Sequence, residues 1–451
     1  MSSPKIFTAR LYDMAERFDP RYHSPLFLHN LRRIRARSYI TVGECCLLSE
    51  ETWNRVTLFA ETFPYIEIGA ISTEDGEIMT KEELLTSEAP SRAQMVIRSG
   101  DILVSMTRPT RNAIARVPAN IRTAIASTGF AVIRSVNSDV VLPDYLFHAL
   151  RLGFCTLQFC QRSSGGNYPA ITKDDLRKVL LPLPPRAVQI RIVAELDAAY
   201  AAKHRADEKA TELLASIDDV VLDALGIPPL PPPDTSLSAR IFTVSSRDVT
   251  EKRLDAIAYQ SIRRKFLKNV KDSSYPIQSI GTLVEVKRLQ TDTLTGQVYV
   301  GMENIDGNTG EFMPSENKET ISSGILFQEG DILVPRLRPY LNKIWHATFD
   351  GVASTEFYSF VAQGVSAAFL AIFLRTKMIS NVLTMLMTGN TLPRVQIEDV
   401  LALPIPVPPE SAQEEIVTKV SAIRAEVKAM KSDAVEHLAA AKSCIEKQLL
   451  N

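Results

Sequence analysis

Hydrophobic residues recur every three or four positions in two long stretches of the chain, one after residue 192 and one after residue 415. This is the spacing of a coiled-coil seam, so the pattern predicts two long helices that pair with each other. The seam positions are Leu196, Tyr200, Lys203, Asp207, Ala210, Leu214, Ile217, Val221 and Ala224 in the first stretch, and Ile416, Val420, Ile423, Val427, Met430, Ala434, Leu438, Ala441 and Ile445 in the second. Lys203 and Asp207 are polar, and either fix the register, mark a contact with another subunit or are exposed at a loose seam.

Shorter hydrophobic runs precede each long helix. Those that are β-branched and bounded by Gly, Pro, Asp or Ser predict strands, and they lie at residues 102–104, 131–133, 298–300 and 332–334. Two further segments, 142–152 and 367–375, predict short helices. Each part of the chain before a long helix is therefore expected to be a mixed α+β domain.

The same series of motifs occurs twice. Gly165-Gly166-Asn167-Tyr168-Pro169 is matched 224 positions later by Gly389-Asn390-Thr391-Leu392-Pro393. Other matched motifs are Gly100–Val104 and Gly330–Val334, Arg108-Pro109 and Arg338-Pro339, Leu181–Pro185 and Ile405–Pro409, Gln189 and Gln413, and Ile192 and Ile416. A repeat of this length predicts two equivalent modules that perform the same task on two equivalent targets.

These patterns divide the chain into five segments. We expect a first globular domain at 1–184, a first long helix at 185–226, a proline-rich linker at 227–240, a second globular domain at 241–408 and a second long helix at 409–451. Gly226 is a typical helix stop, and the run from Pro228 to Pro233 indicates a stiff extended linker, with a proline-rich recognition peptide as the alternative.

Composition narrows the class of protein. A chain of 451 residues with 45% hydrophobic content can bury the cores of two or three domains. No apolar run is long enough to span a bilayer and no secretory signal is evident, so a cytoplasmic location and no membrane partner are expected. The five scattered cysteines favour reduced thiols. Although the net charge is only −1, residues 44–88 are strongly acidic and residues 92–134 are rich in arginine. This uneven distribution indicates either a basic face or an ordinary mixed surface.

Catalytic motifs are missing from the sequence. It contains no Walker A loop, no Gly-x-Ser-x-Gly elbow, no His-Glu-x-x-His and no Asn/Asp-Pro-Pro-aromatic tetrapeptide of adenine methyltransferases. Cys155 and Cys160 near His148 lack a second ligand pair, which favours buried helix cysteines over a metal site. We therefore expect a protein that binds without catalysing, with no catalytic residue, cofactor or metal of its own.

The repeated organisation resembles the specificity subunit of Type I restriction-modification enzymes. The resemblance rests on the two α+β modules, the hydrophobic-Pro-hydrophobic-Pro-Pro-x-x-x-Gln-x-x-Ile segments, the long helices and the Gly-Asp-Ile-Leu-Val motifs, and it covers nearly the whole chain. It departs from the family pattern at Ala187-Val188 and Ser411-Ala412, where a leucine or alanine followed by glutamate is frequent.

The resemblance implies a fold and a set of partners. The fold would be α+β, with two globular α/β target recognition domains in pseudo-twofold repeat, separated by two long helices packed as an antiparallel coiled coil. The partners would be double-stranded DNA, two methyltransferase subunits and restriction/translocase subunits. Catalysis, and the cofactor S-adenosylmethionine, would belong to those partner chains.

Elementary energetics also favour two recognition domains. One domain reads too few base pairs to select a genomic site, because each correct pair contributes only about 1–3 kcal/mol. A second domain engages at high effective concentration, and helices of roughly 38 residues would be roughly 57 Å long, which suits a bipartite target. A catalytic DNA methyltransferase or nuclease with an unrecognised motif, and a repeated protein-binding scaffold, remain alternatives.

Candidate DNA contacts lie in matched loops. Arginine suits guanine and asparagine suits adenine in the major groove, which favours two loops that follow predicted strands. They contain Arg108, Arg111 and Asn112 in the first copy, and Arg336, Arg338, Tyr340, Asn342 and Lys343 in the second. The shared Arg108 and Arg338 favour a scaffold or phosphate role, since residues that discriminate sequence should differ between copies. The glycine-containing loops add Asn167, Tyr168, Asn390 and Arg394, with a simple turn role as the alternative for the two asparagines.

Overall fold

The computed structural model describes residues 17, 19–54, 58–230, 236, 241–245, 261–291, 298–314 and 323–451. By internal contacts the chain divides into two units, the first formed by residues 1–205 with 433–451 and the second by residues 206–432. Each unit thus contains one globular part and half of each long helix. Part of the expected linker, including Pro231, Pro232 and Pro233, lies outside the described residues.

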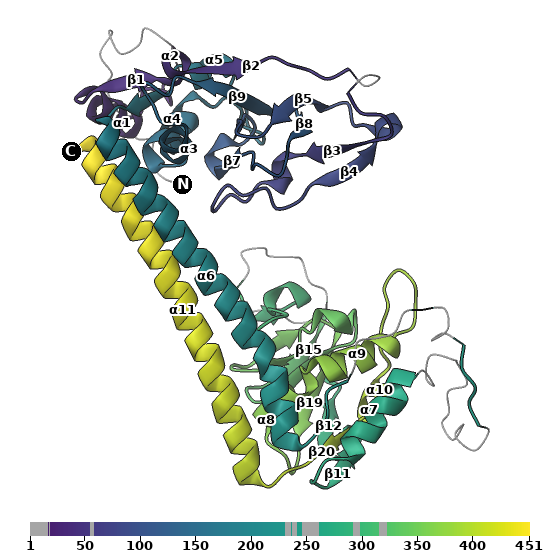
Figure 1. The fold of residues 1–451 in the computed structure, drawn as a ribbon. Coiled ribbons are helices and arrows are strands. Elements are labelled where there is room, and N and C mark those ends of the chain that lie inside the picture. Colours follow the sequence, from purple (N-terminus) through teal and green to yellow (C-terminus); the bar gives the residue numbers. More distant parts are fainter. Residues whose placement is uncertain are drawn as a thin grey trace. The chain divides into compact units, whose positions relative to one another are not determined.

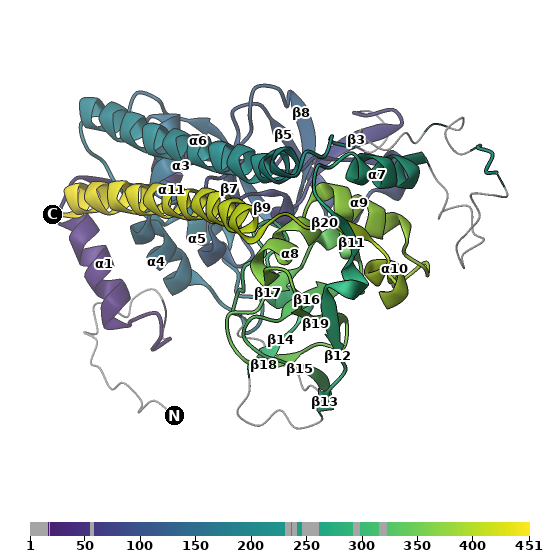
Figure 2. The same cartoon turned by 90° about the horizontal axis from the view of Figure 1, so that it is seen from below.

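The two predicted long helices are present. They are α6 (Arg186–Leu225) and α11 (Glu410–Leu450), which in each unit lie side by side and run in opposite directions (Figures 1 and 2). In the first unit Leu196 shares a hydrophobic cluster with Ile445, and in the second unit Val221 shares one with Ile416. Every predicted seam position is at least partly buried, which confirms the heptad pattern. The polar seam residue Lys203 forms an ion pair with Glu74 of its own unit, its Nζ 3.0 Å from Oε1.

Helix α6 ends where the sequence indicates. Gly226 follows its last residue with a φ of +67°, the left-handed conformation in which glycine commonly ends a helix.

The first unit combines short helices with short strands. Its other helices are α1 (Pro25–Arg35), α2 (Val42–Cys45), α3 (Pro143–Leu150), α4 (Gly153–Arg162) and α5 (Lys173–Arg177). Its strands are β1 (Tyr39–Thr41), β2 (Cys46–Ser49), β3 (Thr62–Ile66), β4 (Glu82–Leu85), β5 (Ala93–Arg98), β6 (Ile102–Ser105), β7 (Ile114–Arg116), β8 (Thr123–Ser127), β9 (Phe130–Val136) and β10 (Leu180–Pro182). Within the described residues the sheet orders are β2-β9-β6-β7, β4-β3-β8-β5 and β1-β10.

The second unit repeats this plan. Its other helices are α7 (Ser261–Lys271), α8 (Ala367–Leu374), α9 (Lys377–Met385) and α10 (Ile397–Leu401). Its strands are β11 (Ile277–Ser279), β12 (Val284–Lys287), β13 (Gln290–Thr291), β14 (Tyr299–Val300), β15 (Gly324–Phe327), β16 (Ile332–Pro335), β17 (Trp345–His346), β18 (Gly351–Ala353), β19 (Phe357–Ala362) and β20 (Pro404–Pro406). The sheet orders among its described residues are β12-β19-β16-β17, β13-β15-β18-β14 and β11-β20. The predicted α+β fold with two repeated domains is therefore confirmed.

Among the described residues, the second sheet has a different fourth strand in each copy. In both, a parallel pair (β3 with β8, β14 with β18) lies beside an antiparallel pair (β5 with β8, β15 with β18). The fourth strand joins β3 in the first unit, as β4, but joins β15 in the second unit, as β13. Among the described residues, the two modules therefore share the strand order of one sheet and three neighbouring strands of the other.

Each repeated proline motif forms a short strand, and a buried glutamine follows it at the start of the long helix. β10 and β20 pair antiparallel with β1 and β11 in the same register. The buried Gln189 then accepts a hydrogen bond from the Leu142 amide (2.9 Å) and donates one to the Pro184 carbonyl (3.0 Å). Gln413 repeats this with the Ser366 amide and the Pro408 carbonyl, both at 2.8 Å. The strongest sequence repeat thus fastens each long helix to its domain.

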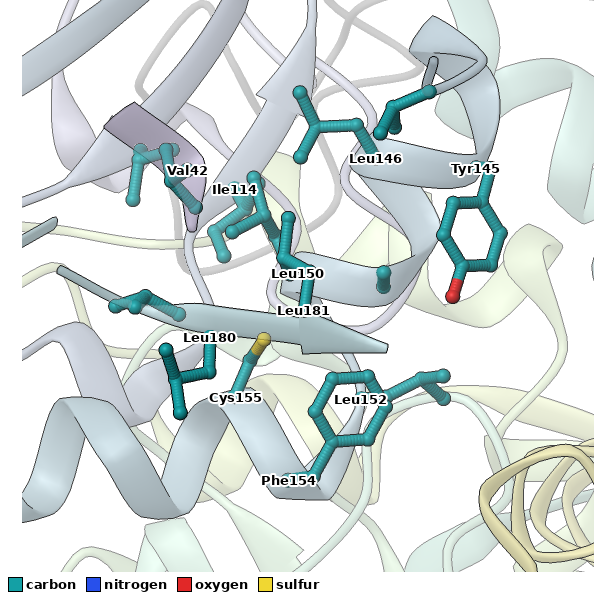
Figure 3. Close-up of a cluster of buried hydrophobic side chains, with 14 of the residues drawn as sticks. Val42, Ile114, Tyr145, Leu146, Leu150, Leu152, Phe154, Cys155, Leu180 and Leu181 are labelled. Atoms are coloured by element: carbon teal, nitrogen blue, oxygen red, sulfur yellow. The ribbon is translucent and has the colours of Figure 1, made fainter. Parts of the chain in front are cut away.

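The core of the first domain lies between its helices and the sheet that contains β6 and β9. Leu146, Leu150, Leu181 and Phe154 are buried together there (Figure 3). Cys155 is buried in the same cluster, and burial raises the pKa of its thiol. Among the described residues, no group of potential metal ligands includes Cys155 or Cys160.

No single helix in the described part of the chain combines the length and apolar character needed to cross a bilayer. The helix pair α8 and α9, bent by 63°, meets that test only when the two are taken together, and the core helices of many proteins do so as well. These helices supply the buried residues Phe369, Phe373 and Ile379 to the core of the second unit.

Candidate nucleic-acid interface

A strained loop follows the same strand in each unit. After β6, Arg108 and Asn112 adopt left-handed conformations with φ of +48° and +63°, on either side of a 3₁₀ turn at Pro109–Arg111. After β16, Arg338 and Asn342 do the same with φ of +46° and +51° around Pro339–Leu341. These four are all the non-glycine residues with positive φ in the described part of the chain. Such conformations are costly and gather at functional sites. We call the segments 108–112 and 338–342 the strand-end loops.

Each strand-end loop is locked by a buried arginine that the sequence analysis did not single out. Asn112 donates to the carbonyl of Arg151 (3.2 Å), and the Arg151 guanidinium donates back to the carbonyls of Asn112 (3.3 Å) and Ile114 (2.7 Å). Asn342 and Arg375 form the same reciprocal pair at 2.8 and 2.6 Å. Burial lowers the pKa of Arg375 to about 9, with Arg424 as the second cause. The 224-residue spacing of Arg151 and Arg375 was the signal available in the sequence.

The structure brings the glycine-containing loops against the strand-end loops. The Arg108 amide donates to the Pro169 carbonyl at 2.6 Å, and the Arg338 amide donates to the Pro393 carbonyl at 3.0 Å. Bridges between Thr107 and Ala170, and between Leu337 and Arg394, continue these contacts. Two segments distant in sequence therefore form one surface in each domain, as their candidate role requires.

In the first unit this surface carries exposed polar and aromatic groups. The Arg108 guanidinium donates to the Asn167 carbonyl at 3.1 Å and lies over the Tyr168 ring, with its carbon 4.3 Å from the ring centroid. Tyr168 is 69% exposed, although large aromatic side chains are usually buried. Arg111 and Asn167 are exposed as well. Arg108 thus braces the two loops, while its neighbours face solvent.

The second unit presents a different set of side chains. Arg338, Tyr340 and Asn390 are exposed there. Arg394 instead binds Glu356 through two hydrogen bonds of 2.9 and 2.6 Å, which holds the pKa of Glu356 below its usual value. Leu392 stands where the first copy has Tyr168, so the arginine–aromatic stack is specific to the first unit.

Three candidates in or beside the second strand-end loop are engaged by their own domain. Asn342 is held by Arg375, as described above, and the Lys343 ammonium donates to the Met302 carbonyl at 2.7 Å. Arg336 lines a cavity of about 260 Å³ and lies over Tyr358, with 5.7 Å between its guanidinium carbon and the ring centroid. These contacts favour a structural role for Asn342 and Lys343, as the equivalent bond does for Asn112. Base contact by Arg336 stays a prediction.

The Gly-Asp-Ile-Leu-Val motif positions the strand that leads into each loop. Asp101 accepts hydrogen bonds from the Arg98 amide (2.8 Å) and from the Arg134 guanidinium (2.9 Å). Asp331 accepts the equivalent bond from the Gln328 amide (2.8 Å), but its cation is Lys287 (2.7 Å). The buried aspartate is shared by both copies, and the cation that neutralises it comes from a different strand in each.

Comparison with known proteins agrees with this geometry. Residues 46–212 match the family model of the Type I restriction modification DNA specificity domain. A stretch of 108 residues is 32% identical to the Type I restriction enzyme HindI specificity subunit of Haemophilus influenzae, covering 24% of this chain and 23% of that protein. A stretch of 94 residues is 32% identical to the EcoDI specificity subunit of Escherichia coli, covering 21% of each. Residues 46–212 therefore resemble a Type I DNA specificity domain, and parts of the chain resemble Type I specificity subunits.

Likeness to a solved structure extends over nearly the whole chain. A chain from a study of complex assembly and conformational transition in the type I R-M system superposes with a TM-score of 0.53 and 23% identity, covering 92% of this chain and 96% of that one. The matched stretches of the curated relatives span only about a quarter of their length. The structural likeness, which covers 92% of this chain, shows a shared fold over a longer stretch than the sequence matches cover.

Proposed function

We propose that this chain is the specificity subunit of a Type I restriction-modification enzyme, a non-catalytic DNA-recognition subunit. It binds a bipartite target, one half-site with each unit, and positions methyltransferase and restriction subunits on that target. The observation that supports this most directly is the presence in both units of a strained, exposed loop surface built on the same shared sheet. Because the scaffold is common and the exposed side chains differ, the two surfaces suit two different half-sites.

The chemistry of these surfaces fits duplex DNA. Arg111 and Asn167 in the first unit offer donors that match base edges or phosphates, and Tyr168 adds an aromatic face. Arg338, Tyr340 and Asn390 offer a different combination in the second unit. The fixed backbone of the strand-end loops holds the Cα positions of their side chains in place, so less conformational entropy is lost on binding. Phosphate contact suits Arg338, because the same arginine occurs in both copies.

Catalysis is assigned to partner chains. Methyl transfer, with S-adenosylmethionine as cofactor, would belong to two methyltransferase subunits, and cleavage to restriction/translocase subunits. The antiparallel helices are the proposed docking surface, since their outward faces are polar and exposed along their length. A protein that selects chromosomal sites would act in the cytoplasm.

Mapping methylated sites in cells that express this chain with its methyltransferase subunits tests the proposal. A single split sequence with an unread gap is expected, and the assembled complex should shift only DNA that contains it. Methyl transfer by the isolated chain with S-adenosylmethionine would instead identify a catalytic enzyme. Indifference of the assembled complex to DNA sequence would favour a protein-binding scaffold.

A further inference from the structure

A cavity of about 470 Å³ in the first unit gathers an unusual set of side chains. It lies between a turn that follows β3, the helix α3 and the first half of α6. Its lining includes Asp75 and Glu77 from the turn and His204 from α6. One ligand atom from each of these three lies within 4.8 Å of the other two. This combination of two carboxylates and an imidazole takes no part in the DNA-facing surface described above.

The spacing of these atoms fits a shared ion better than direct hydrogen bonds. His204 Nε2 lies 3.4 Å from Asp75 Oδ2 and 3.6 Å from Glu77 Oε1. Hydrogen bonds between nitrogen and a carboxylate are about 2.7–2.9 Å long. Tetrahedral ligands at about 2.0–2.1 Å from a zinc ion are separated by about 3.3 Å. The imidazole nitrogen therefore lies from each carboxylate at the distance of neighbouring ligands in one coordination sphere, and the two carboxylates lie within 4.8 Å of each other.

The turn holds the Asp75 carboxylate in place without using the oxygen that faces His204. Asp75 accepts a hydrogen bond from the Glu77 amide through Oδ1 (2.9 Å), which leaves Oδ2 directed at the imidazole. Gly76, between them, has a φ of +81°, and an added Cβ would lie 2.4 Å from the Ile114 carbonyl oxygen. The backbone thus fixes the Asp75 carboxylate, as outer hydrogen bonds fix ligands in metal sites, and sets the position from which the Glu77 side chain extends.

Neighbouring cations are already occupied by other acids. Lys203, next to His204, pairs with Glu74 (3.0 Å), and Arg116, which also lines the cavity, pairs with Asp144. Arg151 lies close to Asp75 but donates to the carbonyls of Ile114 and Thr73. The two carboxylates of the turn consequently converge on an imidazole and not on a lysine or arginine.

We propose that Asp75, Glu77 and His204 bind one divalent transition-metal ion, for which zinc is the best fit. A nitrogen donor combined with two carboxylates suits zinc or manganese, whereas calcium and magnesium prefer oxygen ligands alone. Such an ion joins the turn of the recognition domain to α6, and so ties the domain to the helix that carries it. Water completes the coordination.

The second copy supplies an internal control. The matching turn places Thr309 where the first copy has Asp75, and the matching helix position holds Lys428 in place of His204. Only Glu311 keeps its carboxylate, as the counterpart of Glu77. A lysine cannot serve as the nitrogen ligand while it is protonated, so the second copy has no such site. One ion per chain is therefore expected, not two.

Calorimetric titration of the full-length, chelator-treated chain with Zn²⁺ tests the stoichiometry. One equivalent should bind, and His204→Gln and Asp75→Asn should each weaken binding by at least about tenfold. His437→Gln and Glu83→Gln, which alter an exposed histidine and an exposed glutamate of the same unit, should leave binding unchanged. Binding that persists in both site variants, or is absent in the natural chain, would overturn the proposal.

A spectroscopic readout does not depend on how well the variants fold. Mn²⁺ bound to the natural chain should show pulsed-EPR coupling to an imidazole nitrogen, and that coupling should vanish in His204→Gln while persisting in His437→Gln. A bound ion with no nitrogen coupling in the natural chain would exclude His204 as a ligand. Neither measurement involves DNA, so failure here would leave the proposed recognition role untouched.

Discussion

Arg108 and Tyr168 join two loops that lie far apart in the sequence of the first unit. The guanidinium carbon is 4.3 Å from the ring centroid, and the same guanidinium donates to the carbonyl of Asn167. Leu392 takes the place of Tyr168 in the second unit, so Arg338 has no equivalent ring beside it. The matched arginines therefore have different neighbours in the two units. A substitution at the neighbouring position can thus test each surface separately.

Replacing Tyr168 with leucine should weaken recognition of one half-site only. The change removes a cation–π contact of about 0.5–1 kcal/mol and copies the natural residue of the second unit. Binding of the assembled complex to duplexes with a single altered half-site, followed by fluorescence anisotropy, measures the effect. Leu392→Ala is the matched control and should spare the first half-site. Equal loss at both half-sites for Tyr168→Leu would contradict the assignment of one surface to each unit.

Arg111→Ala should relax specificity at one base pair. Arg111 is exposed at the tip of the first strand-end loop. Leu341 takes its place in the second loop, and such a difference is expected at a position that discriminates sequence. Loss of a bidentate base contact costs about 1–3 kcal/mol of discrimination. Sequencing of selected oligonucleotides would reveal a single degenerate position, with Arg122→Ala as an exposed arginine control. A uniform loss of affinity across all sequences would point to phosphate contact instead.

Gln413→Leu should destabilise the second unit by about 1–3 kcal/mol, because the amide of Ser366 loses its buried acceptor. The two tryptophans of the chain, Trp53 and Trp345, lie in different units, so a Trp53→Phe background lets urea unfolding be followed in the second unit alone. The exposed neighbour Glu414, changed to alanine, should have little effect. An equally small effect of Gln413→Leu would show that the hydrogen bonds of Gln413 do not stabilise the attachment of α11 to its domain.

Periodicity and repetition were sufficient to predict the long helices and the two-domain plan. The seam from Leu196 to Ala224 could be recognised because every turn of a paired helix must bury a residue, and that requirement is visible in a single sequence. The strands at 102–104 and 332–334 were equally clear, since both runs are short, rich in β-branched residues and bounded by residues such as glycine, aspartate and proline. Local physical constraints of this kind leave a local signature.

Contacts between distant segments left no such signature. Nothing near Asn112 in the sequence indicates that Arg151 holds it, and the same is true of Asp75 and His204. The sequence also placed Asn342 and Lys343 with the DNA-facing candidates, because their side chains are polar and the loop is matched. Their hydrogen bonds to Arg375 and Met302 depend on the tertiary fold and favour structural roles. Polar residue type alone does not distinguish a side chain that faces solvent from one that satisfies a carbonyl.

The Arg394–Glu356 pair should make the second unit sensitive to acid. Hydrogen bonds from Arg394 hold the pKa of Glu356 below its usual value of about 4.3. A lowered carboxyl pKa contributes stability above the unfolded value, and that contribution is lost as pH falls through the folded pKa. Glu356→Gln should therefore be less stable than the natural chain at pH 7, with the difference shrinking toward pH 3. Urea unfolding through Trp345 measures it, with Glu414→Gln as control; a pH-independent difference would contradict the prediction.

Matched insertions in the long helices should widen the unread gap in the target. One heptad placed between Arg205 and Ala206 in α6, and one between Ser432 and Asp433 in α11, preserves the seam because both helices keep their register. At about 1.5 Å per residue and about 3.4 Å per base pair, the gap should grow by about 3 base pairs while both half-sites stay the same. Insertion in α6 alone mismatches the seam and is the control, expected to lose assembly. Genome-wide methylation mapping gives the gap directly, and an unchanged gap in the doubly extended protein would rule out the helices as the spacer.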